Sequence, residues 1–205
     1  ACGKDFLIEA SISGHDPDPA GWTLEDSCRF AKEATGCIDI LQLRAPEIDP
    51  NHPTGFTMEP TPWLYMAETV KRSQPDILIS TVAGYIDPVE NEKILAEGKA
   101  DLISMARAFV SNPEYGKLVY EGRPQDIVPC IRCNKCHRSS DSDPWLSVCS
   151  VNPAWAMDHR LGKLIVPPEG TKRVGIVGGG VSGMEAALIC AKRGHQVTLY
   201  EKTGR

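Results

Sequence analysis

The sequence has no long hydrophobic run, and neither sign of charge dominates it. No segment approaches the about 18 consecutive apolar residues that suggest a membrane-spanning helix, and the N-terminus lacks a signal-peptide pattern. The net charge of −5 argues against nucleic acid or an anionic membrane as a partner. Internal repeats and low-complexity tracts are also missing. These absences indicate a soluble globular protein, and 41% hydrophobic residues suffice to build a core.

Four of the eight cysteines show no pairing pattern. Cys2, Cys28, Cys37 and Cys190 are scattered among segments that read as strands or helices. Such scattered thiols are typical of reduced core cysteines and not of a disulfide framework, which predicts a cytoplasmic protein. The chain starts without methionine and stops just after a predicted strand, so we expect a fragment of a larger polypeptide. The sequence leaves oligomerisation open.

The other four cysteines form a metal-binding pattern. Cys130, Cys133 and Cys136 are spaced C-x2-C-x2-C, and Cys149 follows after twelve residues. Three thiolates on a tight loop with a fourth farther away match the Cys₄ ligation of a [4Fe–4S] cluster. A structural zinc also takes four thiolates, but its usual layout is two C-x2-C pairs. The three-plus-one arrangement favours the cluster and leaves zinc as an alternative.

Residues 1–128 alternate between predicted strands and predicted helices. Thr23 is a candidate helix cap, with Asp26 as its acidic partner three positions on. Four β-α units of about 30 residues each match the repeat of a (β/α)8 TIM barrel, so this segment is predicted to be the C-terminal half of one. An open doubly wound sheet gives the same alternation and is the alternative. The expected strands are 6–12, 38–43, 76–82 and 101–105, and the expected helices are about 23–36, 63–73, 88–97 and 112–121.

The remaining residues form two further regions. Residues 129–170 are rich in proline and cysteine and show little periodicity, which predicts a cluster-binding connector. Residues 171–205 are predicted to be the start of a Rossmann-like FAD- or NAD-binding domain, with strands at 172–177 and 196–200 around a helix at about 181–193.

A glycine motif lies between that first strand and the helix. Gly178 permits a tight turn, Gly180 lets a pyrophosphate approach the backbone, and Gly183 lets the helix pack closely on the strand. The helix N-terminus then stabilises the phosphate charge. Glu201, eighteen residues beyond Gly183, is expected to accept hydrogen bonds from ribose hydroxyls. This half-site does not distinguish FAD, ADP and NAD.

A second phosphate site is expected on the barrel half. Gly84 follows the third predicted strand, and Ala106 and Arg107 follow the fourth. Barrels commonly bind phosphate at the loops after their last two strands. Backbone amides near Ala83, Gly84 and Ala106, with Arg107 as counter-charge, are therefore predicted to hold a flavin phosphate. A surface salt bridge is the alternative for Arg107.

Two further residues lie where a barrel would carry its chemistry. His52, in the loop after the second predicted strand, is a candidate proton donor, the alternative being a solvated loop histidine. Arg44, at the end of that strand, is a candidate contact of the flavin or the substrate. An ion pair with Glu47 or Asp49 is the alternative for Arg44.

The order of barrel half, cysteine motif and glycine motif resembles the iron–sulfur members of the old yellow enzyme family. That branch includes 2,4-dienoyl-CoA reductase and trimethylamine dehydrogenase. The resemblance implies FMN in the barrel, a [4Fe–4S] cluster beside it, and FAD or ADP in the C-terminal part. It also implies that electrons pass from NAD(P)H through FAD and the cluster to FMN, which reduces an activated double bond in a small unsaturated molecule.

One position departs from the family pattern. Where the family often has arginine beside the flavin, in Arg-x-Ser-Gly, this chain has Ser11 in Ser11-Ile-Ser-Gly14. A cation there would stabilise the anionic reduced flavin, and Arg44 is the candidate substitute. The resemblance nevertheless implies an NAD(P)H-dependent ene-reductase acting on an enoate or dienoyl thioester. The alternatives are an amine dehydrogenase of the trimethylamine type and a zinc-stabilised nucleotide-binding module without a redox role.

Overall fold

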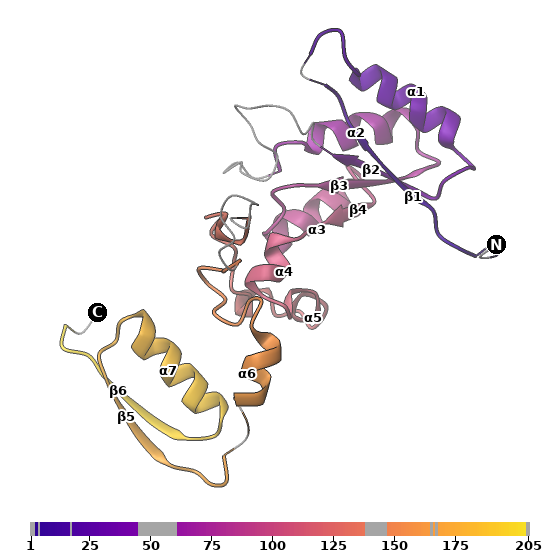
Figure 1. Cartoon of the computed structure of the whole chain (residues 1–205). Coiled ribbons are helices and arrows are strands. Elements are labelled where there is room, and N and C mark those ends of the chain that lie inside the picture. Colours follow the sequence, from indigo (N-terminus) through magenta and orange to yellow (C-terminus); the bar gives the residue numbers. More distant parts are fainter. Residues whose placement is uncertain are drawn as a thin grey trace. The chain divides into compact units, whose positions relative to one another are not determined.

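The chain folds into two compact units, Ala1–Trp155 and Ala156–Arg205 (Figure 1). The computed structural model describes residue 3 and residues 5–16, 18–44, 61–137, 147–164, 166 and 168–203. The connector expected at 129–170 is thus divided between the two units. Within the described ranges, the protein has no helix of the length and apolarity that crossing a membrane requires.

The first unit contains a four-stranded parallel sheet in the order β1-β2-β3-β4. The strands are β1 (Glu9–Ser13), β2 (Ile40–Arg44), β3 (Leu78–Val82) and β4 (Leu102–Ser104). This confirms the predicted parallel strands in sequence order. A doubly wound sheet would instead reverse its strand order within this segment.

Helices follow the strands along the chain, as the alternating pattern predicts. They are α1 (Leu24–Ala34), α2 (Leu64–Ser73), α3 (Pro88–Ala96), α4 (Arg107–Ser111) and α5 (Tyr115–Tyr120). The helix α1 begins as expected, because Thr23 Oγ1 accepts from the Asp26 backbone N–H at 3.1 Å while Asp26 Oδ2 accepts from the Thr23 N–H at 2.9 Å. These reciprocal bonds form a capping box.

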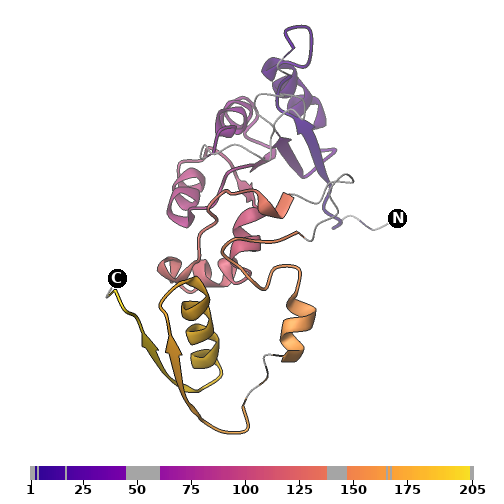
Figure 2. The same cartoon turned by 60° about the vertical axis from the view of Figure 1, so that its left-hand side comes forward.

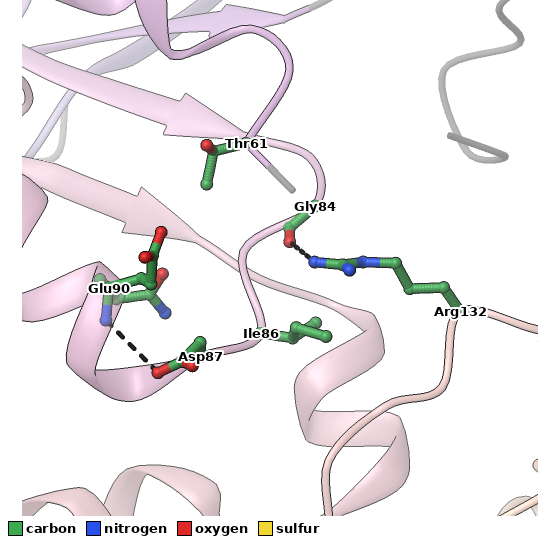
Figure 3. A pocket seen from close by; sticks show the side chains of 7 residues that line it. Thr61, Gly84, Ile86, Asp87, Glu90 and Arg132 are labelled. Carbon is green, nitrogen blue, oxygen red and sulfur yellow. Dashed lines mark hydrogen bonds between the residues drawn. The ribbon is translucent and has the colours of Figure 1, made fainter. Parts of the chain in front are cut away.

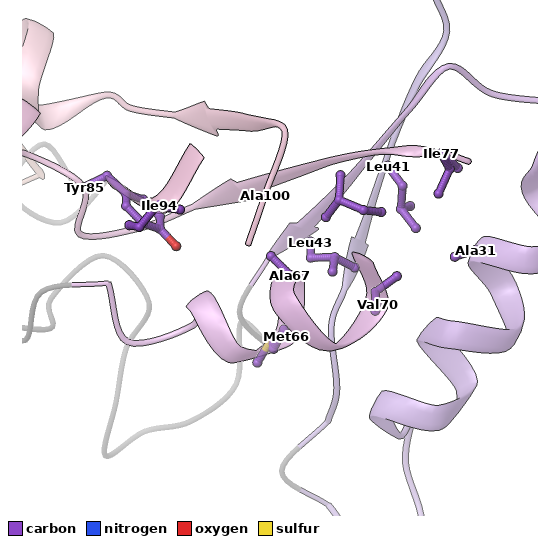
Figure 4. Packing of buried hydrophobic residues seen from close by; sticks show 11 residues of the cluster. Ala31, Leu41, Leu43, Met66, Ala67, Val70, Ile77, Tyr85, Ile94 and Ala100 are labelled. Atoms are coloured by element: carbon purple, nitrogen blue, oxygen red, sulfur yellow. The ribbon is translucent and has the colours of Figure 1, made fainter. Parts of the chain in front are cut away.

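One face of the sheet carries the hydrophobic core (Figure 4). Leu41, Leu43 and Ile79 are almost completely buried, and they alternate with residues on the opposite face as the period of a strand requires. They pack with residues of the helices: Ala31, Met66, Ala67, Val70 and Ile94.

The opposite face carries a polar network centred on Gln42. The Gln42 Nε2 group donates to Glu9 Oε1 at 3.1 Å and to Ser104 Oγ at 3.0 Å. Its Oε1 accepts from Ser11 Oγ at 3.2 Å. Ser104 Oγ lies 3.2 Å from Ser80 Oγ, so the network reaches all four strands.

Two expected elements of the first unit differ most from those observed. The first strand starts at Glu9 and not at residue 6, because its neighbour β2 begins only at Ile40, the register partner of Glu9. The expected helix at 112–121 is replaced by α4 and α5. Asn112 lies between them with an extended backbone, since a residue before proline, here Pro113, is disfavoured in the helical conformation.

The second unit contains two parallel strands and a crossover helix. The strand β5 (Arg173–Val177) pairs with β6 (Gln196–Tyr200), and α7 (Val181–Lys192) packs against both strands (Figures 1 and 2). This is the predicted β-α-β start of a nucleotide-binding domain. A short helix, α6 (Asp158–Leu164), lies earlier in this unit and was not expected from the sequence.

Candidate functional site

The cysteine loop, residues 130–136, lies against the segment that carries Cys149. Ser147 Oγ donates to the Cys136 carbonyl at 2.8 Å and accepts from the Trp155 indole N–H at 2.9 Å. Two residues beyond Ser147 along the chain comes Cys149, followed by Ser150, whose Oγ is 3.2 Å from Cys133 Sγ. Contacts of Ser147 and Ser150, which lie on either side of Cys149, therefore hold this segment against the cysteine loop.

The environments of two of these thiols differ. The Ser150 hydroxyl, with the Lys135 backbone N–H, lowers the pKa of the exposed Cys133 thiol. Burial raises the pKa of Cys136, and the neighbouring Cys130 and Cys149 raise it further while Arg107 lowers it. A thiol whose pKa responds to two other cysteines lies within electrostatic reach of both. Cys130, Cys136 and Cys149 thus share one region of the first unit.

The cysteines are not gathered around one metal ion. Among the described residues, no three or more His, Cys, Asp or Glu side chains are placed to hold such an ion. The ligands of a zinc ion would all lie about 2.3 Å from a common centre, whereas in a [4Fe–4S] cluster the cysteines ligate different irons. A donor set of four cysteine thiols matches the chemistry of a [4Fe–4S] cluster, which stays a prediction.

Two arginines connect the cysteine loop to the sheet. Arg107, 9% exposed after β4, donates from Nη1 to Asn134 Oδ1 at 2.8 Å. Arg132 donates from Nη2 to the Gly84 carbonyl at 3.0 Å, just after β3 (Figure 3). No local pattern in the sequence marks Arg132 or Asn134, because both contacts link residues far apart in the chain.

The predicted phosphate residues lie at these same strand ends. Ala83 and Gly84 both have positive φ, 95° and 82°, and form a turn after β3. Ala106 precedes α4, which starts at Arg107. The cysteine loop is thus held to the two turns where a flavin phosphate was expected, although occupancy by a phosphate stays a prediction.

A pocket of about 290 Å³ lies on one side of the Gly84 turn (Figure 3). Arg132 lines it, but so do the carboxylates of Asp87 and Glu90. Two carboxylates oppose the binding of a phosphate by charge repulsion. A phosphate at this turn would therefore have to lie outside this pocket.

Two other positions singled out in the sequence, Arg44 and Ser11, belong to the neighbouring strands. Arg44 ends β2, is exposed, and pairs in register with Ser13 of β1. Ser11 bonds to Gln42 in the polar network. The candidate proton donor His52 lies outside the described residues, as do Glu47 and Asp49.

In the second unit, the glycine turn has the geometry that its motif predicts. Gly178 has φ 107°, a conformation that residues with a side chain rarely adopt. A Cβ on Gly183 would lie 1.9 Å from the Gly178 carbonyl oxygen, so glycine is required for the close contact of helix and turn. Around Gly180, the N-cap of α7, the described part of the chain places no atom within 4 Å of a Cβ position apart from neighbouring backbone. Because that space is open, the turn fits an approaching pyrophosphate.

Glu201 faces this turn from the end of β6. Its Oε2 accepts from the Gly179 N–H at 2.6 Å, and its Oε1 accepts from the N–H and the hydroxyl of Thr203, both at 2.9 Å. The backbone N–H groups of Thr203 and Gly179 lower the pKa of Glu201 to about 2. Its predicted position is confirmed. A carboxylate has about four lone-pair sites, so about one is left for a ribose hydroxyl.

Known proteins are similar along nearly the whole chain. Residues 176–205 match the family model of an NAD(P)-binding Rossmann-like domain. An NADH oxidase of Thermoanaerobacter brockii is 36% identical over 210 residues, which cover 98% of this chain and 31% of that protein. A multifunctional alkene reductase/demethylase OYE of Caballeronia cordobensis is 31% identical and covers 97% of this chain and 29% of that protein.

A solved structure is also similar to nearly the whole chain. The 2-naphthoyl-CoA reductase in complex with 2-naphthoyl-CoA has a TM-score of 0.78 and 30% identity, covering 94% of this chain and 29% of that one. The chain spans less than a third of the length of these relatives. Together with the order of its sheet, cysteine loop and glycine turn, this similarity is consistent with the iron–sulfur flavoprotein branch of the old yellow enzyme family.

Proposed function

We propose that this chain is part of an NAD(P)H-dependent flavin and iron–sulfur oxidoreductase that reduces an activated C=C bond in an enoate or a dienoyl thioester. The observation that carries the proposal is the attachment of the cysteine loop to the turns after β3 and β4. This attachment brings the candidate cluster ligands to the strand ends at which a barrel enzyme binds its cofactor. The named activities of the relatives, NADH oxidation and alkene reduction, support the same reaction class.

In this proposal the four-stranded sheet is the C-terminal half of a (β/α)8 barrel that holds FMN. The backbone amides near Ala83, Gly84 and Ala106 would hold the flavin phosphate. Arg107 adds a counter-charge, because one bond to Asn134 leaves most of its five N–H donors for a phosphate. Arg44 would offer a cation near the flavin, because Ser11 stands at the position where the family often has an arginine.

The cysteines Cys130, Cys133, Cys136 and Cys149 would hold the [4Fe–4S] cluster. When bound, the cluster supplies one-electron transfer between the two nucleotide cofactors. Ser150 favours the thiolate form that metal binding requires, because it lowers the pKa of Cys133.

The second unit would hold FAD or ADP and serve the reaction with NAD(P)H. Gly178, Gly180 and Gly183 would form the pyrophosphate turn, and Glu201 would accept from the ribose hydroxyls. His52 is proposed as the donor of a proton to the substrate. Because of the scattered cysteines and the net negative charge, we also propose a cytoplasmic protein without a nucleic-acid or membrane partner.

Amine oxidation is a second candidate, because the name of the Caballeronia relative joins alkene reduction with demethylation. The two candidates differ in the direction of electron flow. NADH consumption with an enoyl thioester supports the reductase, whereas reduction of an artificial acceptor by a tertiary amine supports the dehydrogenase.

The proposed cofactor is tested by replacing Cys149 with serine in the purified protein. The wild type should contain iron and show cluster absorbance, and Cys149→Ser should lose most of both. Cys190→Ser is the matched control, because Cys190 lies in α7, outside the cysteine motif. Zinc in place of iron in the wild type would contradict the proposal and favour the zinc module.

A further inference from the structure

The backbone of the cysteine loop adopts an unusual conformation on both sides of Cys133. Arg132 has φ 54° and Asn134 has φ 56°, so both residues lie in the left-handed region without being glycine. Such a conformation is unfavourable for residues with a side chain and persists only when the surroundings hold it. The two residues that carry this cost are also the two residues whose side chains bond to the sheet.

The two bonds cross between loop and sheet in opposite directions. Arg132 extends its guanidinium from the loop to the Gly84 carbonyl, at 3.0 Å. Arg107 extends its guanidinium from the end of β4 to the Asn134 amide oxygen, at 2.8 Å. Each bond involves a charged donor, and such bonds are stronger than those between neutral groups. Cys133 is therefore fixed by an anchor on each side.

Arg132 also lines the pocket beside the Gly84 turn (Figure 3). Its Nε is buried and has no hydrogen-bond partner among the described residues, and the same is true of Asn91 Oδ1. Asn91 is 7% exposed and lines the same pocket, while its Nδ2 donates to Tyr115 Oη at 3.2 Å. A donor and an acceptor that lack hydrogen-bond partners in one polar pocket are typical of a site for ordered water. Bridging water would tie Arg132 to α3 as well as to Gly84.

We propose that Arg132 and Asn134 are positioning residues that clamp the cysteine loop onto the turns after β3 and β4, and thereby fix the separation of cluster and flavin; this rests on the proposed function. Neither residue ligates iron in the proposal. Arg132 holds the Ala83–Gly84 turn, and Asn134 holds Arg107, so the loop and the phosphate residues move as one body. Because electron transfer slows steeply with distance, loss of the clamp should slow it.

The test compares three variants at Arg132. Arg132→Gly removes the clamp but suits a positive φ, Arg132→Ala removes the clamp and keeps the strain, and Arg132→Lys keeps a charged donor. Lys135→Ala is the control, because it removes a positive charge from the same loop without touching Gly84. Asn134→Gly tests the second bond in the same way.

The first measurement is amide hydrogen exchange of residues 83–86 and 130–137 in metal-free protein, which needs no cofactor. We expect exchange about tenfold faster in Arg132→Gly, the order expected for losing a charged hydrogen bond. Arg132→Lys should restore part of the protection, and Lys135→Ala should match the wild type. Equal exchange in wild type and Arg132→Gly would overturn the clamp, even if Arg132→Ala is destabilised.

The second measurement is the rate of electron transfer between flavin and cluster in the loaded protein. It should fall in Arg132→Gly and Asn134→Gly and recover partly in Arg132→Lys. Unchanged rates in both glycine variants would contradict the inferred role in cluster position. If wild-type protein holds no iron but exchange still responds to Arg132, the clamp stands and the proposed function fails.

Discussion

At the scale of single residues, Glu201 shows how a short polar contact shapes a binding turn. Its carboxylate accepts three hydrogen bonds, two of them from backbone N–H groups. A Cβ on Gly179 would lie 3.0 Å from the Glu201 Oε2, so a glycine at this position leaves space for the carboxylate. Glu201 thus organises the turn in addition to its predicted role with ribose.

The lowered pKa of Glu201 predicts acid sensitivity of this turn. Its pKa falls from 4.5 to about 2 in the folded chain, so the unfolded chain binds the proton first as the pH falls. The stabilisation is complete above about pH 4.5 and is lost as the pH approaches 2. Chemical denaturation followed at several pH values should show this loss in the wild type.

Glu201→Gln is the matched control for that experiment. Glutamine keeps the size of the side chain but does not titrate, so its stability should vary less with pH over the same range. Identical pH profiles in the two proteins would show that the carboxylate contributes nothing to the turn.

At the scale of elements, the glycines of the turn have distinct roles. Gly183 decides how closely α7 approaches the turn, whereas Gly180 leaves space for a ligand. The same Gly→Ala change should therefore affect folding at one position and binding at the other.

We expect Gly183→Ala to destabilise the second unit by about 1–3 kcal/mol, the usual cost of overpacking. Gly180→Ala should leave stability nearly unchanged, since Gly180 has φ −68° and open space around it. Its methyl group should nevertheless weaken nucleotide binding. Thermal unfolding and calorimetric titration with ADP measure the two effects. A Gly180→Ala protein that binds ADP normally would place the pyrophosphate elsewhere.

At the scale of the whole molecule, the two proposed cofactor sites fall into different compact units. All four motif cysteines belong to Ala1–Trp155, and the glycine turn with Glu201 belongs to Ala156–Arg205. Residues that share no partner usually contribute independently to stability and binding.

Removal of iron by a chelator should therefore destabilise the first unit and leave ADP affinity within about twofold of its starting value. Calorimetric titration before and after chelation measures the affinity, and hydrogen exchange of residues 130–137 reports on the first unit. A large loss of ADP affinity would show that the two sites are coupled.

The sequence by itself determined the features that depend on residues close together in the chain. The capping box of α1 needs only Thr23 and Asp26, and the glycine turn needs only the residues between β5 and α7. Period and order likewise predicted four parallel strands. Short elements such as α4 and α6 carry too few residues to show a period, and so they were missed.

Only the tertiary structure decided how the cysteine loop is held. Arg132 and Gly84 are 48 positions apart, and Arg107 and Asn134 are 27 apart. No local pattern predicts which distant carbonyl or amide a guanidinium will reach, because that depends on how the loop packs onto the strand ends. Cysteine spacing therefore predicted candidate metal ligands, whereas the tertiary structure decided which residues hold the loop against the strand ends.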